Sequence, residues 1–177
     1  MITYQSTRGS SKKLLFQDII LSGVADDKGL YLPTSTTIEN LSHLTQEDLN
    51  YEDFVQTIFI ALDKNSAKYV EDLSIYPGFE TSPTPSLKEI EENKYVMELF
   101  HGPTKSFKDY ALQPLGAIAD RRLGELGERG LVIVATSGDT GSAAIQAVKN
   151  SKNIDIVLLH THNKVSEYQR RLMTEVI

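Results

Sequence analysis

LVIVATSGDTGSAAIQAVKN (residues 131–150) indicates the fold class of this protein more directly than any other stretch. Residues 131–136 are almost all apolar, which is typical of a strand buried on both faces, and a glycine loop and a helical stretch follow them. A further strand pattern, IDIVLLH, occupies residues 154–160, and another, KYVMELF at residues 94–100, precedes a helical pattern over residues 107–126. This alternation predicts an α/β fold with a parallel sheet in a three-layer αβα arrangement.

The N-terminal part follows a different pattern. Residues 1–76 are mostly helical in character, with one helix predicted within residues 13–24 and another beginning after a cap at Thr45. Residues 77–93 contain three of the six prolines, and proline cannot donate a backbone hydrogen bond, so we expect a linker or a ribbon at a sheet edge. The predicted organisation is therefore a helical domain, this linker, and a partial α/β domain over residues 94–177.

Composition excludes several classes of function. The chain has no cysteine, which excludes disulfides, thiolate catalysis and cysteine-ligated metals. A net charge of −6 without a long basic block argues against nucleic acid as a partner. No run reaches the ~18 apolar residues of a membrane span, and the N-terminus lacks the apolar core of a secretory signal. We therefore expect a cytoplasmic protein that binds neither a membrane nor nucleic acid.

Two histidines are candidate metal ligands. His160 and His162 lie two residues apart at the end of a predicted strand, where they would face the same side. No third ligand is evident nearby, so solvated loop histidines are the favoured interpretation and no metal is expected.

Lys108 lies in the first of two loops whose residues are suited to catalysis or ligand binding. In FHGPTKSFKDYALQ (residues 100–113), Ser106 is placed to cap a helix, with Asp109 three residues later as its capping-box partner. Lys108 would then lie in the first helical turn, at the sheet edge where α/β proteins bind ligands. The positive end of the helix dipole favours the neutral, nucleophilic amine. A surface lysine with a solvated head is the alternative.

The second loop follows the apolar strand at residues 131–136. Glycines at Gly138 and Gly141 would let the backbone approach a ligand, and the N–H groups of the next helix would converge with hydroxyl groups on an anion-sized space. The loop lacks the G-K-[ST] of a P-loop and is not the dinucleotide fingerprint G-x-G-x-x-G. A tight strand-to-helix turn without a ligand is the alternative interpretation. In that case Asp139 or Thr140 would cap the helix.

The two loops together resemble threonine synthase, a family of pyridoxal-phosphate enzymes of the tryptophan-synthase-β fold type, also called fold type II. FHGPTKSFKDYALQ is followed about 25 residues later by ATSGDTGSAA. STRG at residues 6–9, GLYLP at residues 29–33 and VSEYQRRLM at residues 165–173 also look like segments of that family. The resemblance extends over essentially the whole chain, in the same order.

The resemblance implies a function in threonine biosynthesis, the conversion of O-phospho-L-homoserine and water to L-threonine and phosphate. Lys108 would hold the cofactor, pyridoxal 5′-phosphate, as a Schiff base and then move protons. The carboxylate of the substrate, a small molecule, would be bound by the loop that comprises Thr136, Ser137, Gly138, Asp139, Thr140 and Gly141. Lys105 departs from the family, which more often has a small or apolar residue at that position.

Family members are more than twice as long as this chain, and their cofactor-phosphate loop and pyridine-nitrogen partner lie in the second half. We therefore expect an N-terminal fragment, inactive by itself, with a truncated fold type II domain. Two other interpretations stay open: a non-catalytic module that binds a phosphorylated metabolite on the SGDTG loop, and a structural fragment whose exposed sheet edge pairs with a second copy as a homodimer.

Overall fold

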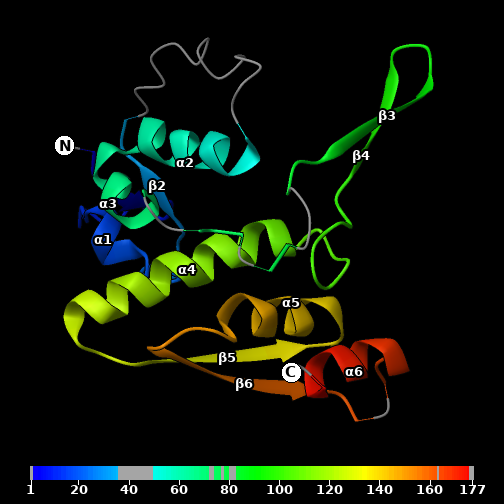
Figure 1. Cartoon of the computed structure of the whole chain (residues 1–177). Helices are drawn as coiled ribbons and strands as arrows, with labels where there is room; N and C mark the ends of the chain where they lie inside the picture. Colours follow the sequence, from blue (N-terminus) through cyan, green and yellow to red (C-terminus); the bar gives the residue numbers. More distant parts are fainter. Residues whose placement is uncertain are drawn as a thin grey trace. The chain divides into compact units, whose positions relative to one another are not determined.

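The computed structural model describes residues 2–35, 50–71, 74–76, 78–79, 83–162 and 164–175. The chain divides into two compact units, Met1–Leu73 and Ser74–Ile177. Figure 1 shows the elements of both units. Among the described residues, no helix combines the length and the apolar character that crossing a membrane requires.

The first unit is a small α+β assembly. Its elements are β1 (Tyr4–Ser6), α1 (Phe16–Ile19), β2 (Tyr31–Pro33), α2 (Tyr51–Leu62), the 3₁₀ helix η2 (Lys64–Ser66) and α3 (Ala67–Val70). β1 and β2 pair antiparallel. The ring of Phe16 lies 6.2 Å from that of Tyr4, 6.5 Å from that of Phe59 and 5.9 Å from that of Tyr69, measured between centroids. These aromatic contacts join the sheet and the helices of this unit into one core.

The helices of this unit differ in part from the sequence prediction. The helix predicted within residues 13–24 is limited to α1, because Leu14 instead forms a β-bridge with Tyr4 and is held there by two backbone hydrogen bonds. α2 begins after Asn50, whose side chain accepts a hydrogen bond from the Asp53 N–H at 2.9 Å. The predicted cap at Thr45 lies outside the described residues.

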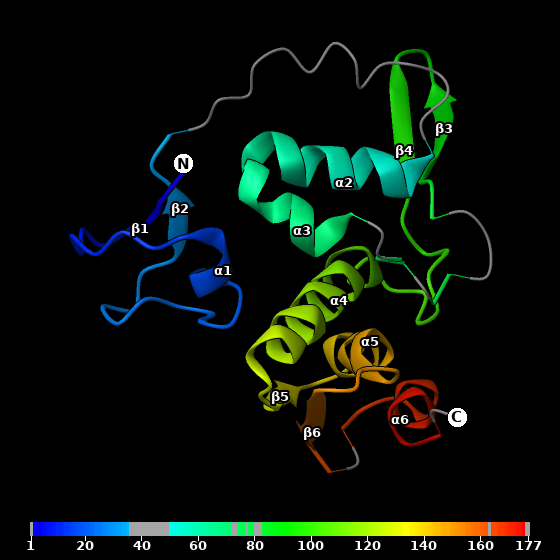
Figure 2. The ribbon, with the colours of Figure 1, turned by 60° about the vertical axis from the view of Figure 1, so that its left-hand side comes forward.

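The second unit begins with an antiparallel hairpin of β3 (Ser86–Glu91) and β4 (Lys94–Glu98). We expected residues 94–100 to belong to the parallel sheet, and this placement is wrong for β4. The turn explains the difference, because Asn93 adopts a positive φ of 60° that suits a tight hairpin turn. Most of β3 and this turn come from the acidic segment 88–93, which lies in the predicted linker or sheet-edge ribbon. Figures 1 and 2 show the hairpin projecting from its unit.

A parallel pair of strands forms the centre of the second unit. Its elements are α4 (Asp109–Leu126), β5 (Gly130–Thr136), α5 (Asp139–Val148), β6 (Ile154–His160) and α6 (Glu167–Thr174). β5 and β6 pair in parallel from Gly130↔Ile154 to Thr136↔His160, as the sequence predicted. α4 and α5 lie on one side of this pair (Figure 1). The buried core there contains Leu123, Val148 and Ile154.

α4 and α5 approach each other closely at a glycine. A Cβ atom added to Gly116 would lie 2.6 Å from the carbonyl oxygen of Ala147, so no larger residue fits without moving a helix. The opposite face of the sheet carries exposed apolar side chains, among them Leu131, Ile133 and Leu159. Within the described residues, helices therefore cover one face of the parallel pair.

Pro114 lies inside α4, and a proline at this position in the sequence favours either a kink or a new segment after Gln113. No new segment begins there, because α4 continues from Asp109 to Leu126. Proline has no N–H, so it cannot donate to the carbonyl group of Tyr110, four residues earlier. The hydroxyl group of Tyr76 donates to that carbonyl oxygen at 3.0 Å. A tertiary hydrogen bond thus satisfies the acceptor that Pro114 leaves free.

Candidate active site

Lys108 is the residue immediately before α4, at its N-terminus. This agrees with the predicted location, but the local contacts differ from the predicted capping box. The Ser106 hydroxyl oxygen accepts from the Lys108 N–H at 3.3 Å. The Asp109 side chain does not return to Ser106; its partner is Thr104. The capping-box assignment to Ser106 and Asp109 is therefore wrong.

Asp109 holds the loop that precedes Lys108. Its carboxylate accepts hydrogen bonds from the Thr104 N–H and the Thr104 hydroxyl group, each at 2.9 Å. The Asp109 side chain is completely buried, and burial raises its pKa above the ordinary value although the bonds from Thr104 and the charge of Lys105 act in the opposite direction. A Cβ atom on Gly102 would collide with this carboxylate. The loop is thus packed around Asp109.

Lys105 occupies the turn of the same loop. Its backbone is in the left-handed region, with a φ of 60°, and its N–H donates to the Gly102 carbonyl oxygen at 3.1 Å. The residue is exposed. A lysine at this position therefore leaves the close packing around Asp109 intact.

The Lys108 ammonium group lies over the Phe107 ring, with Nζ 4.7 Å from the centroid. Phe107 is itself 62% exposed, so this cation–π contact is at the surface and weak. A weak contact of this kind leaves the lysine free to turn toward another partner.

The glycine loop connects β5 to α5 and is held by Thr136. The Thr136 hydroxyl oxygen accepts from the N–H groups of Gly138 and Gly141, at 3.1 and 3.2 Å. Helix α5 begins at Asp139, and its geometry supplies no intrahelical acceptor for the N–H groups of Asp139 and Thr140. These two donors lie at the positive end of the helix dipole, which is a favourable environment for an anion.

Residues of both loops line one cavity of about 300 Å³. Its lining residues are Lys108, Ala135, Thr136, Ser137, Gly138, Asp139, Thr140 and Gln169. Of the residues that the resemblance assigns to the site, Gly141 does not line the cavity. A Cβ atom added to Gly141 would lie 2.6 Å from Cγ2 of Thr136 and 2.8 Å from the sulfur of Met173 in α6. Close helix packing therefore requires the glycine at this position.

Sequence reasoning missed Gln169 as a residue of this site. Ser166 and Gln169 have the S-x-x-Q spacing that predicts a capping box, and that box is present at the start of α6. The Gln169 side chain also donates to the Asp139 carboxylate at 2.6 Å. The two residues are 30 positions apart, and nothing in the sequence signals this contact.

The two histidines lie at the end of β6 and just after it. His160 is the last residue of β6 and is exposed, as is His162 in the following turn. Within the described parts of the chain, no group of three or more His, Asp or Glu side chains is arranged to hold a metal ion.

The fold and the site define a class of protein: an α/β unit with a ligand-sized cavity where the carboxyl end of a parallel strand meets two helix N-termini. Residues 3–70 match the family described as Threonine synthase N terminus. The sequence is 42% identical to threonine synthase of Pseudomonas aeruginosa over 98% of this chain and 38% of that protein.

Solved structures agree with this relationship. The crystal structure of PLP-bound threonine synthase from Brucella melitensis matches with a TM-score of 0.86 and 36% identity, over 98% of this chain and 39% of that one. Threonine synthase from yeast matches with a TM-score of 0.84 and 28% identity, over 97% of this chain and 38% of that one. The chain is therefore a relative of the threonine synthases and corresponds to their N-terminal part; it spans less than two fifths of their length.

Proposed function

We propose that this chain supplies the cofactor lysine and the substrate-carboxylate loop of a threonine synthase, which converts O-phospho-L-homoserine and water to L-threonine and phosphate. The observation that carries the proposal is a cavity lined by both Lys108 and residues of the TSGDTG loop. Its relatives are named threonine synthases, and one was solved with PLP bound. A cytoplasmic location and a homodimer remain predictions.

The residues at the cavity fit part of a pyridoxal 5′-phosphate site. Lys108 provides an amine at a helix N-terminus, and the loop provides hydroxyl groups and backbone donors on the facing side. When bound, the cofactor supplies an electron sink for reactions at the amino-acid carbon atoms. By resemblance to the family, the groups that hold its phosphate and its pyridine nitrogen belong to the part of the relatives that this chain does not span.

Each loop has its own part in the proposed reaction. Thr136 and Ser137 at the end of β5, with the free N–H of Thr140, bind and orient the substrate carboxylate. The amine of Lys108, once released from the cofactor, moves protons at Cα and Cβ of the substrate as a general base and acid. Asp109 fixes the loop before Lys108 through Thr104, which limits where that amine can lie.

Covalent trapping tests the assignment of Lys108. The protein is mixed with pyridoxal 5′-phosphate, reduced with borohydride and digested, and the labelled peptides are identified by mass spectrometry. We expect the label to be concentrated on Lys108 and to be lost in Lys108→Ala. Lys105→Asn is the matched control, because Lys105 lies in the same loop and asparagine tolerates its positive φ. Equal labelling of Lys105 and Lys108 would contradict the assignment.

Activity distinguishes the remaining alternatives. We propose that the 177 residues alone form little or no threonine, because the cavity described here provides only the lysine and carboxylate side of the site. Measurable threonine from O-phospho-L-homoserine would contradict this. Phosphate binding that weakens with salt, without labelling of Lys108, would instead support the non-catalytic binding module.

A further inference from the structure

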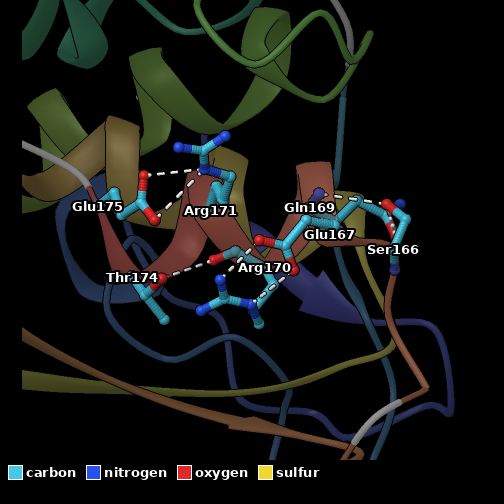
Figure 3. Close-up of polar contacts among 7 residues, drawn as sticks. All are labelled: Ser166, Glu167, Gln169, Arg170, Arg171, Thr174 and Glu175. Carbon is cyan, nitrogen blue, oxygen red and sulfur yellow. Dashed lines mark hydrogen bonds and ion pairs between the residues drawn. The ribbon is translucent and has the colours of Figure 1, made fainter.

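Gln169 connects helix α6 to the glycine loop through the two ends of one amide group. Its oxygen accepts from the Ser166 N–H at 3.3 Å and from the Ser166 hydroxyl group at 3.1 Å. Its nitrogen donates to the Asp139 carboxylate at 2.6 Å. Figure 3 shows Gln169 beside Ser166 at the start of α6. A side-chain amide can accept through its oxygen at one helix and donate through its nitrogen to a carboxylate at another.

The same face of α6 contacts both glycines of the loop. A Cβ atom on Gly138 would lie 2.6 Å from the Gln169 nitrogen, and one on Gly141 would lie 2.8 Å from the Met173 sulfur. Gln169 and Met173 are four residues apart, so they lie one above the other on a helix. Met173 is buried, whereas the bond between Gln169 and Asp139 is close to solvent. Met173 packs α6 onto α5, and Gln169 reaches the part of the loop that lines the cavity.

Helix α6 has other interactions that stabilise it. Glu167 pairs with Arg170 at 2.7 Å, and Arg171 pairs with Glu175 at 3.1 Å (Figure 3). Both pairs lie within the helix, at spacings of three and four residues that support helical structure. The hydrogen bond from Gln169 to Asp139 is not one of the hydrogen bonds within α6. We therefore expect it to stabilise the position of the loop.

We propose that Gln169 is a positioning residue for the carboxylate-binding loop: its side-chain amide holds Asp139, and with it the first turn of α5, in the arrangement that lines the cavity. The role as part of a substrate site rests on the proposed function. The mechanical link between α6 and the loop does not depend on the proposed function.

Gln169→Glu separates the two roles of this side chain. The introduced glutamate still accepts from Ser166, since Ser-x-x-Glu is a common capping box, and a negative charge in the first turn favours the helix. It cannot donate to Asp139 and repels that carboxylate. Amide hydrogen exchange by NMR at neutral pH should show about three- to tenfold faster exchange at Gly138 and Gly141. Exchange at Arg170 and Glu175, whose N–H groups bond within α6, should be unchanged.

A reversed pair provides the rescue. In the double variant Asp139→Asn/Gln169→Glu, the introduced asparagine donates and the introduced glutamate accepts, so the bond is restored with opposite polarity. Protection at Gly138 and Gly141 should return to within about twofold of the original protein. A residue that merely packs against the loop would not be rescued by this exchange.

Two results would overturn the proposal: unchanged exchange at Gly138 and Gly141 in Gln169→Glu, or no recovery in the double variant. Faster exchange throughout α6 in Gln169→Glu would also contradict it, because the side chain would then act on its own helix. The exchange experiment uses no cofactor. Absence of a label on Lys108 would therefore refute the proposed function and leave this link standing.

Discussion

Asp109 illustrates how one buried carboxylate organises the loop beside Lys108. Both of its oxygen atoms accept from Thr104, and Gly102 is packed against it. Bonds to a charged acceptor contribute about 1.5–3 kcal/mol each, less the cost of burying the charge. The resemblance of FKD to the family therefore has a local physical basis: the lysine can take part in chemistry, and the neighbouring aspartate fixes its loop.

We predict that Asp109→Asn destabilises the second unit by about 1–3 kcal/mol at low pH and by less at neutral pH. Burial raises the pKa of Asp109, so just above about pH 4 the native protein keeps a proton that the unfolded chain has lost. The contribution of Asp109 to the free energy of unfolding therefore falls as pH rises through this window, and asparagine has no such titration. Urea unfolding between about pH 4 and 7 measures the difference. A cost that grows with pH would contradict the prediction.

Tyr4 is expected to make the stability of the first unit depend on pH in the alkaline range. Burial, with the charge of Asp63, raises the pKa of Tyr4 to about 12. Between about pH 10 and 12 the unfolded chain loses this proton while the native protein retains it, so stability should fall by up to about 2–3 kcal/mol. Tyr4→Phe should lack that loss, as measured by urea unfolding at about pH 9 and 11. An equal loss in both proteins would show that other groups cause it.

At the scale of the element, helix α4 shows how a tertiary contact overrides a local signal. Proline inside a helix costs about 3 kcal/mol or more. α4 nevertheless continues through Pro114, and Tyr76 donates to the carbonyl group that the proline leaves free. The prediction of a new segment at this position rested on propensity alone and could not include a donor 34 residues away along the chain from Tyr110.

A double-mutant cycle tests this explanation. Tyr76→Phe should destabilise the second unit by about 1 kcal/mol, because a partly buried carbonyl group loses its tertiary donor. In the Pro114→Ala background the same change should cost clearly less, since the alanine N–H can donate to the Tyr110 carbonyl oxygen within the helix. Urea unfolding of the four proteins gives the coupling energy. Equal costs in the two backgrounds would mean that Tyr76 acts through ring packing instead.

At the scale of the whole molecule, one face of the β5–β6 sheet carries exposed apolar side chains in the part of the chain that the structure describes. Leu131, Ile133 and Leu159 are 58%, 63% and 56% exposed. Contiguous apolar surface of this kind is uncommon on soluble monomers and mediates association. The relatives extend beyond the part that this chain matches, so the 177 residues alone present apolar surface to solvent.

We predict that the 177-residue chain self-associates reversibly at micromolar concentration. Ile133→Thr should weaken the association several-fold, because it removes apolar area and keeps a β-branched side chain that suits a strand. Ile133→Val is the matched control and should have little effect. Sedimentation velocity over a range of concentrations measures the change. A monomer at every concentration, or an equal effect of both substitutions, would argue against association through this face.

The sequence by itself determined the features that depend on neighbours along the chain: the apolar strands of the parallel pair, the glycine turn into α5, the capping box of α6 and the location of Lys108 at a helix N-terminus. Each of these follows from side-chain periodicity, turn chemistry or capping within a few residues. For the same reason, the hairpin was misassigned, because a strand pattern does not state which strand it will pair with.

Only the tertiary structure brought Lys108 to the TSGDTG loop, Gln169 to Asp139 and Tyr76 to the carbonyl group above Pro114. These contacts join residues about 30 positions apart. They form because β5 pairs in parallel with β6 and α4 packs on α5, and this packing fixes the ends of the intervening segments. Closing those segments costs conformational entropy, which local propensity does not show. The candidate site thus combines residues that the sequence could identify with a geometry that long-range packing alone creates.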